Sequence, residues 1–295
     1  MKTHKLTSVK KEGFMGRLYT PDTPSKKSVV VMTGGDGGIK NADYIAQCFA
    51  EKGINALSLA YFGISGVQKN LIEVPLECIE SAVSYLKEKT QCGAVALYGL
   101  SKGAELSLLS ASLIGDIDCV VAVVPNYYVA SGFTKVGRPI GNRSSWSYRG
   151  NPMPYVPIVG KLSDTVKTYF REGESNQTKV YHEAEAVGIP EETLIRVEES
   201  HAAILCISTA CDRVWLSKNA GDKIVGRLKN SGYPYAYHHE SFEYVSHFLC
   251  PLSASYEKML PRMFKVEKQK PLDCRNARQA AFGLAVDWIV KYSNV

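Results

Sequence analysis

The sequence predicts an α/β fold: a mostly parallel sheet of eight strands with helices on both faces and an insertion after the sixth strand. Short apolar runs typical of strands alternate with amphipathic runs of helical spacing, and this alternation implies right-handed β-α-β units. The composition is that of an ordinary globular protein of 295 residues. Since α/β folds of about 250 residues or more occur as one unit, we expect residues 1–295 to form a single domain.

The expected elements follow one another in a regular order. Residues 14–19 alternate between apolar and polar side chains and predict an early edge strand, which we expect to pair with residues 5–10. The apolar run 28–33 predicts a strand that stops in a glycine-rich loop at 34–38. Further strands are expected at 54–60, 94–98, 118–124, 203–209 and 235–239, and helices at 41–53, 73–90, 102–114, 214–231 and 275–291.

The alternation of strands and helices stops after Pro125. Residues 126–172 are rich in Tyr, Gly, Pro and Arg, and residues 173–200 predict a polar helical stretch, so we interpret 126–200 as an insertion or lid. The net charge of the chain is +6, and residues 135–171 carry seven basic residues against one acid. This local excess favours a small anionic ligand over nucleic acid, and a solvated basic loop is the alternative interpretation.

Composition excludes several classes of protein. The longest strongly apolar run, 119–124, is far shorter than the roughly 20 residues that a membrane-spanning helix needs. No apolar stretch follows the lysines of the amino terminus, so we expect no signal peptide, no membrane partner and a cytoplasmic protein. The eight cysteines include no C-x-x-C pair and are expected to be free, mostly buried thiols rather than zinc ligands or disulfides.

Residues 99–103, Gly-Leu-Ser-Lys-Gly, match the pattern Gly-x-Ser-x-Gly between a predicted strand and a predicted helix. In this position the pattern is typical of a nucleophile elbow, a strained turn in which glycines avoid clashes and expose the serine hydroxyl. We therefore take Ser101 as the candidate nucleophile. The alternative is a tight helix-entry turn whose glycines serve packing alone.

A serine nucleophile needs a base and an acid, which follow it along the chain in the order Ser, acid, His. Asp212 follows the strand 203–209 and is the candidate acid, with a helix N-cap as its alternative role. The weaker candidates for the acid are Asp222, Glu240 and Glu243. For the base, His247 lies in the loop after the last strand, whereas His238 and His239 lie within that strand or at its end.

The tetrahedral intermediate of such a reaction needs backbone N–H donors around its oxyanion. Lys102, directly after the serine, supplies one, and Gly35 or Asp36 in the loop 34–38 supplies the other. A dinucleotide-binding interpretation of this loop is disfavoured because Gly-Gly-Asp-Gly-Gly does not match G-x-G-x-x-G. The expected chemistry requires no metal or cofactor.

Several segments together resemble the carboxyl-terminal catalytic domain of the acyl-CoA thioesterase and bile acid-CoA:amino acid N-acyltransferase (BAAT) family, over about residues 14–125 and 203–291. The segments that carry the resemblance are VVVMTGGDGGIKNADYIAQCFAEKG, INALSLAYFG, VALYGLSKGAELSLLSAS, ISTACDRVW and HHESFEYVSHFLCP. The resemblance implies an α/β-hydrolase fold, thioester substrates, and Ser101, Asp212 and His247 as nucleophile, acid and base.

Three differences from members of the family bear on the expected function. Mammalian members carry an amino-terminal β-sandwich domain, and we expect any substrate contact made by that domain to be missing here. The family's amidating members have Cys as nucleophile, so Ser101 favours a hydrolase over a transferase. Residues 126–172 do not follow the expected pattern, and the acyl pocket therefore cannot be carried over from the family.

The sequence thus predicts a serine hydrolase that cleaves acyl-CoA or a similar small acyl thioester through an acyl-enzyme. The alternatives are a carboxylesterase or dienelactone-hydrolase-type enzyme on small esters, an acyltransferase to an amine acceptor, and a non-catalytic binding module. Nothing in the sequence decides the oligomeric state. Candidate contacts to the CoA phosphates are Arg138, Arg143 and Arg149, and candidates for an acyl channel, or else for the core of the lid, are Tyr127, Tyr128, Trp146, Tyr148 and Tyr155.

Overall fold

Eight strands form the central sheet in the order β1-β2-β4-β3-β6-β7-β12-β13. The first two pairings, β1 with β2 and β2 with β4, are antiparallel, and the other neighbours pair in parallel. The prediction of a mostly parallel eight-stranded sheet is therefore confirmed. The computed structural model describes residues 1–134, 139–160 and 162–293. The strands of this sheet are β1 (Lys2–Thr3), β2 (Met15–Thr20), β3 (Ser28–Met32), β4 (Asn55–Ala60), β6 (Val95–Leu100), β7 (Ile117–Val123), β12 (Ala203–Thr209) and β13 (Tyr237–Phe242).

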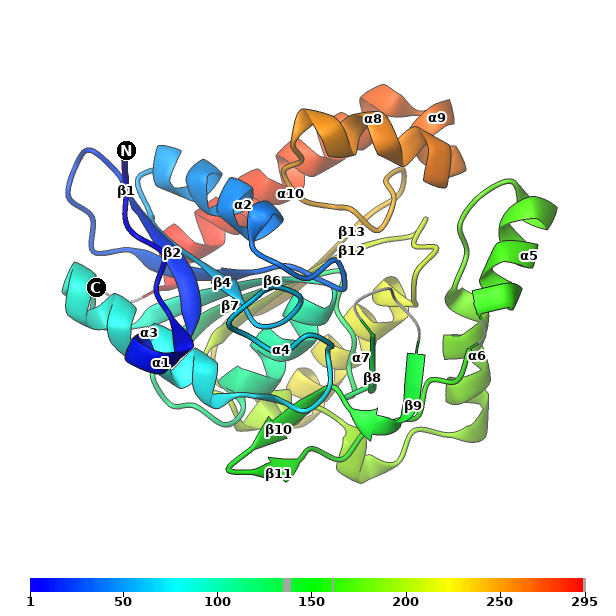
Figure 1. Ribbon diagram of the computed structural model, residues 1–295, viewed down its shortest axis with the longest axis horizontal. Helices are drawn as coiled ribbons and strands as arrows, with labels where there is room; N and C mark the ends of the chain where they lie inside the picture. Colours follow the sequence, from blue (N-terminus) through cyan, green and yellow to red (C-terminus); the bar gives the residue numbers. More distant parts are fainter. Residues whose placement is uncertain (135–138, 161, 294–295) are drawn as a thin grey trace.

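Helices cover both faces of the sheet, because successive side chains of a strand point to opposite faces. In β3, Val29 and Val31 pack in one apolar core with α2 (Lys40–Glu51) and α10 (Pro271–Tyr292). Val30, between them, packs in the other core. The helices of that second face are α3 (Glu77–Thr90), α4 (Lys102–Ala111) and α7 (Ser217–Asn230). Figure 1 shows these helices on the two sides of the sheet.

The amino-terminal edge differs from the prediction. The two-residue strand β1 pairs with β2, and Val9–Glu12 forms the short helix α1. Within the expected partner segment 5–10, Thr7 donates its backbone N–H to the Gly16 carbonyl oxygen of β2 at 2.9 Å. The Glu12 carboxylate accepts the backbone N–H of Ser8 at 2.8 Å, and Gly13 ends the helix in the left-handed region at φ 81°. A short helix with a glycine cap thus takes the place of the expected strand after Thr7.

The segment between β7 and β12 forms its own small elements, as expected for an insertion after the sixth strand of the sheet. It contains short strands, helices and 3₁₀ turns rather than one polar helical stretch over 173–200. These elements are β8 (Ser131–Phe133), β9 (Pro139–Ser144), β10 (Trp146–Tyr148), β11 (Asn151–Pro152), α5 (Leu162–Glu172), α6 (Thr178–Val187), η1 (Glu191–Thr193) and η2 (Val197–Glu199). The strand β10 also pairs with β5 (Val74–Pro75), which precedes α3.

The parallel strands bring their carboxyl ends to one edge of the sheet. The loop 34–38 follows β3, and Ser101 follows β6 directly. Asp212 follows β12, and His247 lies in the loop after β13, ahead of α8 (Ala254–Met263) and α9 (Lys265–Gln269). Segments far apart in the sequence therefore meet at this edge. In the described ranges, no helix is long and apolar enough to cross a membrane.

Candidate active site

Ser101 occupies a strained turn between β6 and α4. Its backbone has φ 59° and ψ −118°, a positive φ that residues other than glycine adopt rarely. The flanking glycines are required by space: a Cβ on Gly99 would lie 2.1 Å from the Gly103 carbonyl oxygen, and a Cβ on Gly103 would lie 2.6 Å from the Met32 carbonyl oxygen. The spacing Gly-x-Ser-x-Gly thus has a steric cause in this turn.

The imidazole of His247 is paired with the carboxylate of Asp212. The Nδ1 atom of His247 lies 3.0 Å from Oδ1 and 2.9 Å from Oδ2 of Asp212, and both side chains are buried. Trp215 and Phe248 pack edge-on against the imidazole, with ring centroids 5.7 and 6.0 Å away. The ring is thus held by one charged partner and two aromatic neighbours.

The alternative role of Asp212 as a helix N-cap does not apply. The helix α7 begins at Ser217, and its N-cap residue is Leu216. Instead, Asp212 Oδ1 accepts the backbone N–H groups of Val214 at 2.8 Å and Trp215 at 3.2 Å, in the turn ahead of the helix. These bonds orient the carboxylate toward His247.

A cavity of about 250 Å³ lies beside Ser101 and His247. The candidate oxyanion donors Lys102, Gly35 and Asp36 border the same cavity. Gly34 approaches the serine closely, because a Cβ there would lie 2.8 Å from Ser101 Cβ and 3.1 Å from its Oγ. Most of the wall is apolar and includes Ile45, Leu100, Phe133, Ile158, Val214, Trp215, Phe248, Leu252, Met263 and Phe264.

Asp36 brings a carboxyl group to this cavity. Its side chain accepts a hydrogen bond from the Asn41 amide, and burial raises the pKa of Asp36 above its ordinary value. Asn41 and Tyr256 border the cavity as well. Asp36, Asn41 and Tyr256 therefore form a polar corner in a wall that is largely apolar.

The weaker candidates for acid and base lie away from this cavity, and two of them pair with each other. His239 Nδ1 lies 2.9 Å from Asp222 Oδ1, and its Nε2 lies 2.7 Å from the hydroxyl of Ser208. This is a serine–histidine–aspartate arrangement, but Ser208 is fully buried inside β12. His238 is exposed beside Glu240, and Glu243 borders a different, shallow cleft.

The arginines predicted to contact the CoA phosphates and described by the structure do not lie beside Ser101. Arg143 forms an ion pair with Glu73, with 3.0 Å between Nε and Oε1, and Arg149 contacts Glu80 at 3.2 Å. Neither borders the cavity described above. Arg138 lies outside the described residues. The two arginines that are described neutralise carboxylates of the β5–α3 region instead.

The predicted aromatic channel is part of the protein's packing. Trp146 and Tyr128 are fully buried, and Tyr148 donates its hydroxyl to Glu80 at 2.9 Å. Tyr155 packs against the core. Tyr127 borders a separate cleft of about 630 Å³ beside α7, where Lys223 lies 4.2 Å from its ring centre. The larger cleft therefore does not coincide with the candidate catalytic residues.

Apart from the candidate catalytic residues and oxyanion donors, the residues that line the cavity were not identified from the sequence. Phe133, Ile158 and Tyr181 come from the insertion, whose pattern carries no recognisable spacing. Trp215 had a usable signal, because it stands three residues after Asp212 in the Asp-x-x-Trp stretch. Tyr256 and Phe264 come from the α8–α9 region, which contributed no motif.

Solved structures with a similar architecture define the fold of this protein. A putative dienelactone hydrolase from Klebsiella pneumoniae has a TM-score of 0.61 at 10% identity, with 99% of this chain and 100% of that chain covered. The α/β hydrolase MGS-M1 from a Medee basin deep-sea metagenome library has a TM-score of 0.58 at 18% identity, with 99% and 97% covered. The fold is that of the α/β hydrolases, as predicted.

Sequence comparison then identifies the family. The family profile "BAAT / Acyl-CoA thioester hydrolase C terminal" matches residues 74–254, and the chain belongs to this family. Acyl-coenzyme A thioesterase 1 of Mus musculus is 28% identical over 218 residues, which cover 73% of this chain and 47% of the relative. The Homo sapiens acyl-coenzyme A thioesterase 1 is 29% identical over 220 residues, covering 74% and 48%. The chain spans about half the length of these curated relatives.

Proposed function

We propose that this protein is a serine hydrolase that cleaves acyl thioesters. Ser101 Oγ attacks the acyl carbonyl carbon while His247 takes the hydroxyl proton, and Asp212 orients and stabilises the imidazolium. The backbone N–H of Lys102 and that of Gly35 or Asp36 stabilise the oxyanion. Collapse of the intermediate breaks the C–S bond, and His247 protonates the leaving thiolate. Water then attacks the acyl-enzyme, with His247 as base, and releases the carboxylic acid.

The observation that supports this proposal most strongly is the meeting of two features at one cavity. One is Ser101 in its strained turn, and the other is the buried pair of His247 and Asp212. A serine placed beside a histidine whose other nitrogen is held by a carboxylate is the general arrangement of activated serine nucleophiles. Membership of the thioester hydrolase family supports thioesters as the substrate class.

We further propose that acyl-CoA binds with its acyl group in the cavity and its phosphates outside. The wall is largely apolar, which suits an acyl chain. Among the described residues that line the cavity, Lys102 is the only Lys or Arg, and its ammonium is paired with Glu105. A phosphate inside the cavity would therefore lack a free cationic partner in the described part of the chain.

In this proposal residues 1–295 are one hydrolase domain, and the insertion 126–200 acts as its lid. The support is that the insertion supplies part of the cavity wall. Its contributing residues are Ser131, Gly132, Phe133, Ile158, Ser175, Gln177 and Tyr181. Changes in this segment are expected to alter which acyl groups are accepted more than they alter the reactivity of Ser101.

The test is labelling with a fluorophosphonate probe, followed by turnover of acyl-CoA thioesters and p-nitrophenyl esters. Labelling of the wild-type protein that is lost in Ser101→Ala, together with CoA release, is the expected result. Turnover confined to short oxyesters would replace the thioesterase proposal by the small-ester hydrolase. A requirement for an amine acceptor would indicate an acyltransferase. No labelling of the wild-type protein would rule out an activated Ser101.

A further inference from the structure

Lys102 and Glu105 form a buried ion pair in the first turn of α4, directly after Ser101. Their side chains are 3% and 0% exposed, and Lys102 Nζ lies 2.9 Å from both carboxylate oxygens of Glu105. Burial lowers the pKa of Lys102, and the carboxylate of Glu105 opposes that shift. Two charges are thus held out of water at the helix that carries the candidate nucleophile.

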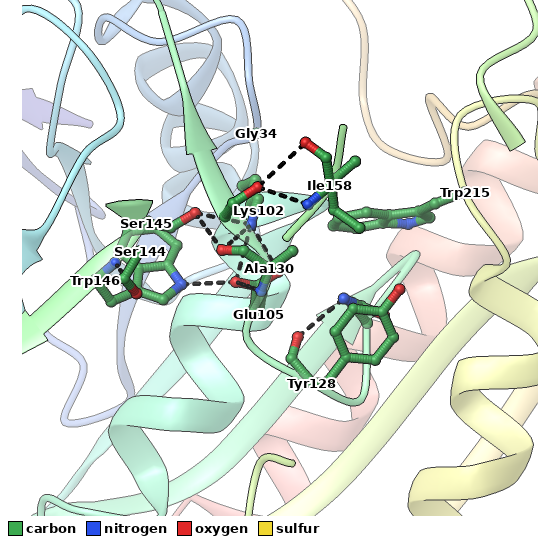
Figure 2. A network of polar contacts seen from close by, with 12 residues as sticks. Gly34, Lys102, Glu105, Tyr128, Ala130, Ser144, Ser145, Trp146, Ile158 and Trp215 are labelled. Atoms are coloured by element: carbon green, nitrogen blue, oxygen red, sulfur yellow. Dashed lines mark hydrogen bonds and ion pairs between the residues drawn. The ribbon is translucent and has the colours of Figure 1, made fainter. Parts of the chain in front are cut away.

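The remaining partners of this ion pair come from the insertion. Lys102 Nζ also donates to the hydroxyl of Ser145 at 2.9 Å and to the carbonyl oxygen of Ala130 at 3.4 Å. Glu105 Oε1 accepts the indole N–H of Trp146 at 2.8 Å and the backbone N–H of Ala130 at 3.2 Å. Figure 2 shows how these residues surround the ion pair. An ammonium has three donors, and each has a partner here.

The same contacts hold one wall of the catalytic cavity. Ala130 directly precedes β8, and Ser131, Gly132 and Phe133 of this strand border the cavity. The Ser145 hydroxyl donates to the Ala130 carbonyl oxygen at 2.8 Å, next to the register pair Ser131–Ser144. The ion pair therefore connects the helix that follows Ser101 to a wall of the cavity that Ser101 borders.

Stability alone does not account for two charges at this place. Apolar residues of similar volume often replace a buried ion pair at no cost in stability, whereas charged and hydrogen-bonded groups fix one relative orientation of the segments they join. Neither Ser145 nor Trp146 lines the cavity, so their contribution acts through the position of other groups.

We propose that Lys102 and Glu105 are positioning residues, which hold the β8 wall at a set distance from Ser101 and thereby determine which acyl groups react. The inference rests on the proposed hydrolase function and adds the source of acyl selectivity. It predicts that changes outside the cavity, at Ser145 and Trp146, alter the ratio of kcat/KM between long and short acyl thioesters. A purely structural network would lower the amount of folded enzyme and leave this ratio unchanged.

The experiment compares Glu105→Gln, Ser145→Ala and Trp146→Phe with the wild-type protein. Active sites are titrated with fluorophosphonate, and kcat and KM are measured for acetyl-CoA and for a long-chain acyl-CoA. The expected result is a fall in the long-to-short ratio of kcat/KM of about tenfold to a hundredfold, because small displacements at a reacting site cost rates of this order. The KM of the long-chain substrate is expected to rise more than that of acetyl-CoA.

Matched controls make the same chemical changes elsewhere. Ser200→Ala removes a buried hydroxyl with two partners, and Trp288→Phe removes an indole N–H bonded to a carbonyl oxygen. Both are expected to keep the wild-type ratio. If Glu105→Gln does not fold, the double variant Lys102→Met with Glu105→Leu takes its place in the comparison. The double variant removes both charges and so leaves no unpaired buried charge.

The outcomes separate the two proposals. An unlabelled wild-type protein defeats the hydrolase proposal and this inference with it. A labelled wild-type protein whose long-to-short ratio persists in Ser145→Ala, Trp146→Phe and the charge-removing variant overturns the positioning role alone. A changed ratio in these variants, with an unchanged ratio in both controls, supports it.

Discussion

His247 Nδ1 lies within 3.0 Å of both carboxylate oxygens of Asp212. The backbone N–H groups of Val214 and Trp215 also donate to this carboxylate, so Asp212 is held in place independently of the histidine. The contact favours the tautomer with the proton on Nδ1, which leaves Nε2 as the proton acceptor that a serine nucleophile requires.

Asp212→Asn is expected to lower kcat by about 10⁴-fold without unfolding the protein, because an amide that donates to Nδ1 selects the wrong tautomer. Steady-state turnover of an acyl-CoA substrate measures the effect, and circular dichroism checks the fold. Asp222→Asn is the matched control, since it removes the same charge from the pair with His239, and its kcat is expected to stay near wild type. Full activity of Asp212→Asn would exclude this residue as the acid of the site.

Gly34→Ala is expected to slow fluorophosphonate labelling of Ser101 by about a hundredfold, because the new Cβ displaces the reacting groups. That Cβ would lie 2.8 Å from Ser101 Cβ and 3.1 Å from Oγ. Gly115→Ala is the control, since a Cβ there meets nothing within 4 Å. The labelling rate is read from a time course on gels. Equal rates in the two variants would show that the loop 34–38 does not restrict the serine.

Phe133→Ala is expected to raise the ratio of kcat/KM for branched or aromatic acyl thioesters over acetyl-CoA by about tenfold, a typical effect of added space in an apolar pocket. The ring of Phe133 borders the cavity and packs edge-on against the ring of Phe62, with 6.0 Å between the ring centroids. Phe170→Ala serves as the control, because this ring, also in the insertion, is 81% exposed. An unchanged acyl preference in Phe133→Ala would place the acyl group elsewhere in the cavity.

The stability of the protein is expected to fall as the pH drops below 6.5, in part through His239. Burial lowers the pKa of His239 from its ordinary value of 6.5, despite the opposing effect of Asp222. Below this pH the unfolded chain binds a proton that the folded chain still excludes, so protonation favours unfolding. The destabilisation caused by His239 is absent well above pH 6.5 and reaches its full size only below the lowered pKa.

Urea unfolding between pH 5 and pH 8 tests this prediction in the wild-type protein and in His239→Gln. The variant cannot titrate at this position, so its free energy of unfolding is expected to depend less on pH in this window. Nearby charged groups, Asp222, His238 and Glu240, remain in both proteins. If the free energy of unfolding depends on pH in the same way in both proteins, His239 is not responsible for the loss of stability.

The sequence was informative where a local pattern has one physical cause. Apolar runs of strand length separated by amphipathic helices specify a parallel sheet, and the strand 203–209 matches β12 at both ends. The pattern around Ser101 identified the turn because Gly99 and Gly103 have no room for a Cβ. The chain order then singled out Asp212 and His247, which the fold brings into contact.

The partners of the charged and aromatic residues in the insertion could be identified only from the folded protein. Seven basic residues in 135–171 suggested an anion site, but Arg143 and Arg149 pair with carboxylates more than sixty positions earlier. Trp146 was a candidate for an acyl channel or, more commonly for such aromatic residues, for the core of the lid, and packing placed it beside Glu105. Phe133, which the sequence did not single out, borders the cavity. Hydrophobicity and charge are properties of single residues, whereas the partner of a charge and the face of a ring are set by the whole fold. For this reason the sheet and the candidate catalytic residues could be predicted from the sequence, whereas the wall of the cavity beside Ser101 became known only from the folded protein.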